Sequence, residues 1–79
     1  MDAPELKSKF MDAVEKERHV GRPTFEIRNK RSSACLGYVG WYGQWRCFAF
    51  VPAGDLVIFN ADCLDSIADF CRELGRAHP

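Results

Sequence analysis

The sequence predicts an α+β fold in which an antiparallel meander of three to four strands is flanked by an N-terminal and a C-terminal helix, in the order α-β-β-β-β-α. Three observations support this fold class. Apolar residues recur at helical spacing near both ends of the chain, and the middle alternates apolar and polar residues. Short polar turns separate the alternating runs, which favours antiparallel pairing of successive strands. The 79 residues are expected to form one domain, 1–79.

The first predicted element is a helix that starts near Asp2 and ends near Gly21. Asp2 can cap it, and Pro4 is tolerated in a first turn whose N–H groups lack helical partners. Its apolar face consists of Leu6, Phe10, Ala13 and Val14. Gly21 is a residue type that commonly follows the last turn of a helix.

Strands are predicted next. The run 24–29 places Phe25 and Ile27 on one face, with Glu26 and Arg28 on the other. A polar turn over 29–33 leads into an aromatic hairpin over 36–52, which holds six of the ten aromatic residues of the chain. The apolar run 56–59 is predicted to be a short, well-covered fourth strand.

The hairpin is predicted to fold about a two-residue type II′ turn, Gly43-Gln44, because Gly suits the positive φ of the first turn position. Tyr42 then pairs with Trp45, and side chains alternate between the two faces. The predicted core face consists of Val39, Trp41, Phe48 and Phe50. The second face consists of Leu36, Tyr38, Tyr42, Trp45, Cys47, Ala49 and Val51. Gly37 leaves room for the ring of Phe50.

The last predicted element is an amphipathic helix capped by Asn60 or Asp62 and ended by Gly75. Its buried stripe consists of Leu64, Ile67, Ala68, Cys71 and Leu74, widened by Cys63 and Phe70. Its outer side carries an acidic stripe, which consists of Asp62, Asp65, Asp69 and Glu73. The acidic stripe either contacts a basic groove of a partner or is a solvated face that pairs with Arg72 and Arg76.

The second hairpin face is the principal candidate binding site, centred on Tyr38, Tyr42 and Trp45, with Arg46 near the hairpin tip. If both helices pack on one side of the sheet, this aromatic face is exposed, and such patches mark interaction sites. If one helix packs on each side, both aromatic sets are core. The sequence leaves both arrangements open.

Composition argues against several other functions. Net charge is zero, and the basic cluster Arg22, Arg28, Lys30 and Arg31 lacks interleaved aromatic residues, which argues against nucleic-acid binding. No nucleophile motif or glycine-rich phosphate loop indicates an enzyme or a cofactor. Neither cysteine spacing nor His19 and His78 form a typical zinc pattern. Without a signal peptide or a membrane-length apolar run, we expect a cytosolic protein with reduced cysteines.

The pattern L-G-x-ϕ-x-W-Y-x-x-W-R-x-ϕ-x-F-x-P over 36–52, where ϕ is apolar, resembles a set of small phage and prophage proteins. The resemblance continues into the segment 59–70 and spans about 25–74. It implies a place among host-takeover and anti-defence proteins. Some small phage α+β proteins of this kind are anti-CRISPR inhibitors, which bind subunits of a CRISPR surveillance complex.

The predicted function is therefore a non-enzymatic, protein-binding inhibitor of anti-CRISPR type that acts on a host protein or nucleoprotein complex. Its contacts would come from the aromatic hairpin face or from the acidic stripe. Two alternatives are an assembly module that forms a homodimer through the aromatic face and a small nucleic-acid-binding protein.

Overall fold

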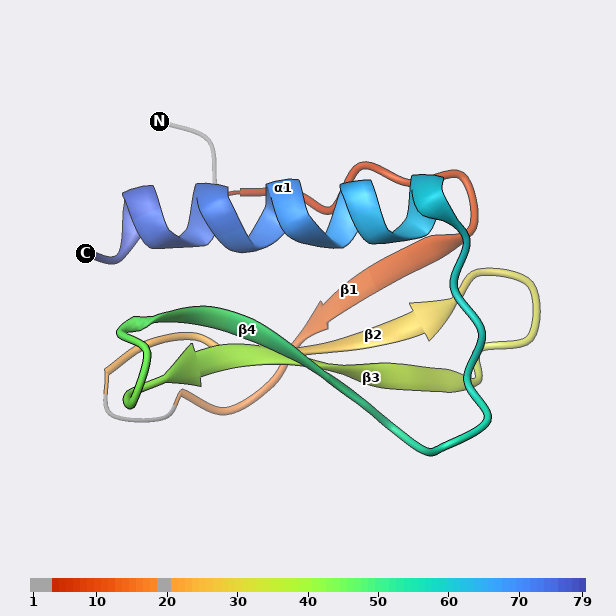
Figure 1. Ribbon diagram of the computed structural model, residues 1–79, viewed down its shortest axis with the longest axis horizontal. Helices are drawn as coiled ribbons and strands as arrows, with labels where there is room; N and C mark the ends of the chain where they lie inside the picture. Colours follow the sequence, from red (N-terminus) through yellow and green to blue (C-terminus); the bar gives the residue numbers. More distant parts are fainter. Residues whose placement is uncertain (1–3, 19–20) are drawn as a thin grey trace.

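Four antiparallel strands and one helix make up the protein in a computed structural model that describes residues 4–18 and 21–79. The strands are β1 (Met11–Glu15), β2 (Phe25–Asn29), β3 (Cys35–Tyr42) and β4 (Cys47–Pro52), and α1 spans Ala61–Ala77. The sheet order is β1-β2-β3-β4. Helix α1 lies along one side of this sheet (Figure 1). The predicted α+β class and the antiparallel meander are confirmed.

The prediction of an N-terminal helix is wrong. Residues 4–10 have no regular secondary structure, and the next five form β1, whose Met11 pairs with Asn29 of β2. The Ser8 hydroxyl accepts hydrogen bonds from the backbone N–H groups of Phe10 (3.1 Å) and Met11 (3.2 Å), which turns the chain out of a helical path. The predicted Asp2 cap lies outside the described residues. An isolated helix of this length is marginal in water, whereas β1 buries Met11 and gains a full ladder.

The hairpin loop is longer than predicted. Tyr42 pairs with Cys47, so a four-residue loop, 43–46, replaces the two-residue turn. The left-handed backbone conformation falls on Arg46 (φ 54°), not on Gly43. Relative to the prediction the register moves by two residues, and Trp45 moves into the loop. Because the strand period is two, the residues that pair between β3 and β4 keep their predicted faces. One exception is Leu36, which lies at the bulge opposite Arg28 and packs against the core.

The predicted strand over 56–59 is also wrong. This segment forms no strand and carries the chain from the end of β4 to the start of α1 (Figure 1). Leu56 and Ile58 are 93% and 92% exposed, so the segment is not well covered. The ring of Phe59 packs edge-on against Phe50 at 5.2 Å between centroids. That contact holds the end of the segment against the core. The segment forms no strand because it must leave the sheet to reach the helix layer.

The hydrophobic core lies between α1 and one sheet face. Its buried members are Met11, Ile27, Val39, Phe48, Ile67, Phe70 and Leu74. Phe25 of β2 meets Phe70 of α1 edge-on at 5.0 Å. Asn60 is the helix cap, and its side chain accepts a hydrogen bond from the backbone N–H of Cys63 at 2.8 Å. The helix continues through Gly75 to Ala77, and the predicted stripe residue Leu64 is 52% exposed.

Candidate binding face

The second sheet face is open, because α1 covers only the first. Tyr38 is 49% exposed, Tyr42 38% and Trp45 70%. Neither predicted arrangement is found, because both assumed two helices and the described residues contain one; the aromatic face is nevertheless at the surface. We call this surface, together with the adjoining hairpin loop, the open face. Its members are Asp12, Val14, Lys16, Glu17, Arg18, Thr24, Glu26, Arg28, Lys30, Cys35, Tyr38, Gly40, Tyr42, Trp45, Arg46, Cys47, Ala49 and Val51.

The aromatic side chains of the open face are arranged by the hairpin. Tyr38 and Tyr42 lie on the same side of β3 because four residues separate them in a strand of period two. Trp45 belongs to the loop, and its backbone N–H donates to the Tyr42 carbonyl at 3.1 Å. This turn brings the Trp45 ring edge-on to the Tyr42 ring, with centroids 4.6 Å apart. The Tyr42 hydroxyl donates to Gln44 Oε1 at 2.8 Å, which orients its ring.

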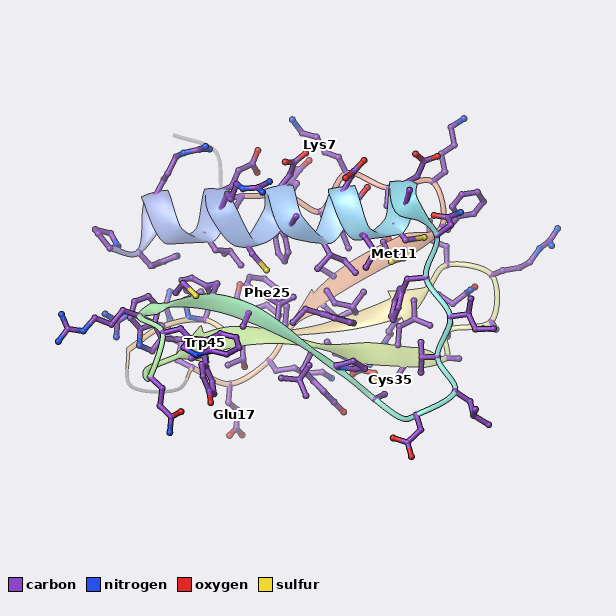
Figure 2. The ribbon with its side chains drawn as sticks, in the orientation of Figure 1. Lys7, Met11, Glu17, Phe25, Cys35 and Trp45 are labelled. Carbon is purple, nitrogen blue, oxygen red and sulfur yellow. The ribbon has the colours of Figure 1, made fainter. Side chains whose placement is uncertain are left out.

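A groove of about 660 Å³ runs over the open face. One side consists of β3 and β4 residues, and the other is the segment that follows β1. The Lys16 N–H donates to the Thr24 carbonyl at 2.8 Å, and the Thr24 hydroxyl donates to the Glu17 carbonyl, so this segment is held in place. Figure 2 shows Glu17 on the side of the sheet away from α1. The floor of the groove lies close to the backbone at Gly40 and Ala49, which pair across β3 and β4 and have small side chains or none.

Glu26 is the electrostatic centre of the open face. Its carboxylate accepts the Arg28 guanidinium at 3.0 Å and lies 3.2 Å from the Lys16 ammonium. The hydrogen bond from Arg28, with support from Lys16, lowers the pKa of Glu26 to about 2 despite partial desolvation. The neighbouring Cys35 thiol and the charge of Glu26 raise the pKa of Tyr38.

The open face carries a positive charge that the whole chain does not. Its five cations are Lys16, Arg18, Arg28, Lys30 and Arg46, and its three carboxylates are Asp12, Glu17 and Glu26, a formal excess of two positive charges. Among these charges, Asp12 pairs with Arg28 across β1 and β2, and its carboxylate lies 3.9 Å from the Lys30 ammonium. Across the molecule, α1 has four acidic and two basic residues. A neutral chain thus separates its charge between the helix and the sheet.

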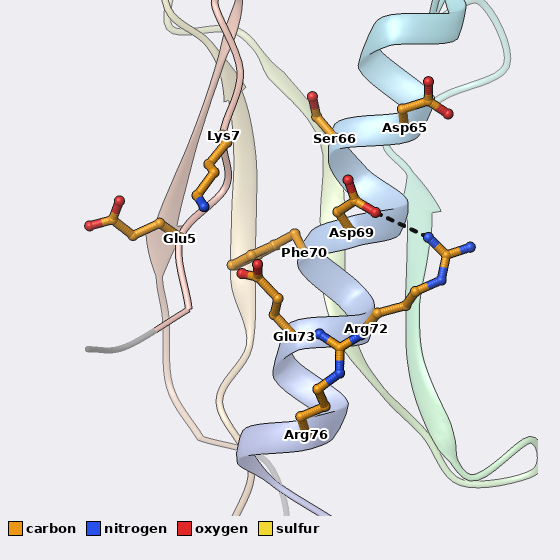
Figure 3. A pocket seen from close by; sticks show the side chains of 9 residues that line it. All are labelled: Glu5, Lys7, Asp65, Ser66, Asp69, Phe70, Arg72, Glu73 and Arg76. Atoms are coloured by element: carbon orange, nitrogen blue, oxygen red, sulfur yellow. Dashed lines mark hydrogen bonds and ion pairs between the residues drawn. The ribbon is translucent and has the colours of Figure 1, made fainter. Parts of the chain in front are cut away.

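The acidic stripe lies on α1, on a different surface from the open face. Its members Asp65, Asp69 and Glu73 line a small pocket of about 210 Å³ together with Glu5 and Lys7 of the N-terminal segment (Figure 3). The Arg72 guanidinium lies 3.2 Å from the Asp69 carboxylate. One flat partner surface cannot contact both this stripe and the open face, since the two lie on opposite sides of the molecule.

Sequence reasoning missed the cations from the segment after β1. Lys16 was placed on the predicted helix, and Arg28 was read as part of a separate basic cluster. Pairing of β2 with β3 sets Glu26 directly opposite Tyr38, which brings the charged and aromatic residues onto one surface. The alternation that begins at Met11, with Met11 and Ala13 inward, was the signal that could have placed β1.

Two further features bear on the site. All four cysteines are free thiols, and two of them, Cys35 and Cys47, belong to the open face. Within residues 4–18 and 21–79, no three histidine, cysteine or acidic side chains are grouped to hold a metal ion, and His19 lies outside these ranges. The described part of the chain contains no helix with the length and apolar character to cross a bilayer.

Together these features define a small α+β protein with one helix-covered sheet face and one open aromatic face. No family model matches the chain, and no solved structure matches it. Over 56 residues the chain is 32% identical to an uncharacterized 9.3 kDa protein of Acholeplasma phage L2, an alignment that covers 68% of this chain and 70% of the relative. The chain belongs to the family of this phage protein. This relationship is consistent with the predicted phage origin, and the anti-CRISPR assignment stays a prediction.

Proposed function

We propose that this protein is a non-enzymatic, phage-encoded inhibitor that binds a host nucleoprotein complex through the open face. The observation that carries the proposal is the exposure of Tyr38, Tyr42 and Trp45 on a sheet face that α1 does not cover. Contiguous exposed aromatic surface on a small protein usually marks an interaction site. Trp, Tyr and Arg are also the residue types that dominate binding hot spots.

The specific form of this proposal is an anti-CRISPR-type inhibitor. Its support is the phage relative together with the resemblance over 36–52, and a binding face without a catalytic constellation suits an inhibitor that acts by occupation. The protein would cover a surface that the host complex needs for DNA or for one of its subunits. Occupation requires affinity and complementary shape, which a rigid sheet face provides at low conformational cost.

The acidic stripe is the weaker candidate for the contact. Asp69 is already paired with Arg72, and Glu73 and Asp65 lie among the nearby cations Lys7 and Arg76. Charges that are satisfied within the chain gain less from a new partner. We therefore place the principal contact on the open face.

Affinity capture from host lysate tests the proposal. The bait is the tagged protein, compared with a Tyr38→Ala/Trp45→Ala double variant and with a matched Leu56→Ala/Ile58→Ala variant, which truncates two exposed apolar side chains elsewhere. We expect the first variant to lose the captured complex and the second to retain it, with circular dichroism showing that both are folded. Equal recovery by all three proteins would refute the open-face mechanism.

Light scattering over a range of concentrations tests the homodimer alternative. We expect a monomer, because two copies that meet through the open face would bring their excess positive charges together. A stable dimer whose formation is abolished by Tyr38→Ala/Trp45→Ala would replace the inhibitor proposal with assembly.

A further inference from the structure

We infer that the open face contacts single-stranded nucleic acid, so that the groups it recognises in a nucleoprotein partner are unstacked bases and their phosphates. This inference rests on the proposed function in one respect only, that the open face is the binding surface. It goes further by naming the chemistry of the occupant. The supporting observations are the spacing of the rings, the space between them and the charge around them.

The rings of the open face are placed as a stacking platform. Tyr38 and Tyr42 project from the same side of β3, roughly 13 Å apart along the strand at about 3.3 Å per residue. Gly40 lies between them and pairs with Ala49, so no large side chain fills the space between the two rings. A Cβ at Gly40 would meet only the Thr24 side chain within 4 Å. Planar groups can enter from solvent and lie against the exposed rings, as single-strand bases do on aromatic side chains.

Cations surround this platform. Lys16 and Arg18 lie along one side of the groove, and Arg46 is exposed in the hairpin loop. Arg28 lies on the same side of β2 as Glu26, two residues further along, and Glu26 pairs with Tyr38 across β2 and β3. Glu26 neutralises only one of the two cations that share it. The resulting excess of positive charge is complementary to a phosphate backbone.

The same observations disfavour the other occupants. A second copy would bring a positive face against a positive face. Bases in a duplex are already stacked and present only their edges, so they cannot cover the rings of Tyr38 and Tyr42. The sequence argued against nucleic acid because the chain is neutral and because its basic cluster contains no aromatic residues. The fold removes both objections, since it confines the acidic stripe to α1 and gathers cations beside the rings.

Fluorescence anisotropy with labelled oligonucleotides tests the inference on the intact protein. The probes are an oligothymidylate and an oligouridylate of about a dozen nucleotides and a mixed-sequence duplex of equal length. We expect the single strands to bind more tightly than the duplex at low salt. Tyr38→Ala should weaken single-strand binding by about five- to a hundredfold, whereas Tyr38→Phe, which keeps the ring, should bind as the wild type does.

A matched pair of arginine variants separates the open face from general charge. Arg46→Gln and Arg76→Gln remove the same charge from two exposed positions, one in the hairpin loop and one on α1. We expect only Arg46→Gln to weaken binding and to reduce the dependence of log affinity on log salt by about 0.7. Absence of oligonucleotide binding at low salt would overturn the inference, as would equal losses in the two variants or tighter binding of the duplex.

The outcomes distinguish this inference from the proposed function. If no oligonucleotide binds but Tyr38→Ala/Trp45→Ala still abolishes capture of a host complex, the occupant is protein and the inference fails alone. If oligonucleotides bind through Tyr38 but no host complex is captured, the inhibitor proposal fails alone. If the wild type neither binds oligonucleotides nor captures a host complex, both the inference and the proposed function are refuted.

Discussion

Gly37 is the position at which the structure makes its sharpest prediction about stability. The residue lies in β3, between Ile27 of β2 and Pro52 of β4, and is buried. A Cβ at this position would lie 2.5 Å from Cζ of Phe50 and 2.7 Å from its Cε1, and it would also collide with the Val51 carbonyl oxygen. Carbon atoms prefer separations of roughly 3.5–4.0 Å. The sequence predicted room for Phe50 beside Gly37, and the structure shows that the ring uses it.

We expect Gly37→Ala to lower the free energy of unfolding by about 3 kcal/mol. Overpacking a core typically costs about 1–3 kcal/mol, and this position belongs at the upper end because the backbone oxygen of Val51 is held in the β3–β4 ladder and cannot rotate away. The corresponding decrease in Tm is roughly 12–24 °C, at about 4–8 °C per kcal/mol for a domain of this size. Urea unfolding followed by circular dichroism measures the change, with thermal melts as a second readout.

Gly75→Ala is the matched control, because it makes the same substitution where nothing lies within 4 Å of the new methyl group. Gly75 is inside α1, so alanine should increase the free energy of unfolding by about 0.5–1 kcal/mol through its higher helix propensity. The two variants should therefore shift in opposite directions. A Gly37→Ala variant as stable as the wild type would refute the packing around Phe50, and a destabilised Gly75→Ala variant would refute the helical assignment of the last turn.

Three further predictions concern single contacts. Asn60→Ala should cost about 1 kcal/mol in urea unfolding because the Cys63 N–H loses its cap acceptor, while Asn60→Asp keeps it. Ile58→Ser should change the free energy of unfolding by less than about 0.5 kcal/mol, because its side chain is exposed. Phe59→Ala should lower Tm clearly, because its ring packs against Phe50. Equal Tm values for the two variants would contradict this difference in packing. Glu26 has a folded pKa near 2 against an ordinary value of 4.5, so its stabilisation is present above pH 4.5 and is lost as pH falls toward 2. Glu26→Gln should lack that part of the acid dependence in unfolding measurements from pH 2 to 6, and parallel profiles would argue against the ion pairs.

Local patterns predicted the elements whose structure depends on local chemistry. The strand over β2 is confirmed with Phe25 and Ile27 on one face, as predicted, and the structure shows that this face is the core side. The polar turn after it was also predicted, and the Asn29 side chain accepts hydrogen bonds from the backbone N–H groups of Arg31 and Ser32. The predicted faces of the paired hairpin residues are correct although the predicted turn is wrong, because an error of two residues in register does not exchange the sides of a strand.

The errors arose where distant partners decided the conformation. The spacing of Leu6, Phe10 and Val14 fits a helix, but the unpaired edge of β2 gives β1 a ladder that a helix would not have. The apolar run after β4 fits a strand, yet the chain must cross there to the helix layer. As a consequence, the apolar side chains of Leu56 and Ile58 are exposed to solvent. A local sequence window does not contain the distant residues that decide between these conformations.

The sequence by itself determined which hairpin residues share a face and narrowed the cap of the last helix to Asn60 or Asp62, because strand alternation and helix capping involve only neighbouring residues. Only the tertiary structure decided that α1 covers one side of the sheet, which leaves Tyr38, Tyr42 and Trp45 at the surface and sets Lys16 and Arg28 beside them. Exposure and charge proximity are properties of the packed chain, since they depend on residues that are far apart in sequence and meet only when β1, β2 and β3 pair.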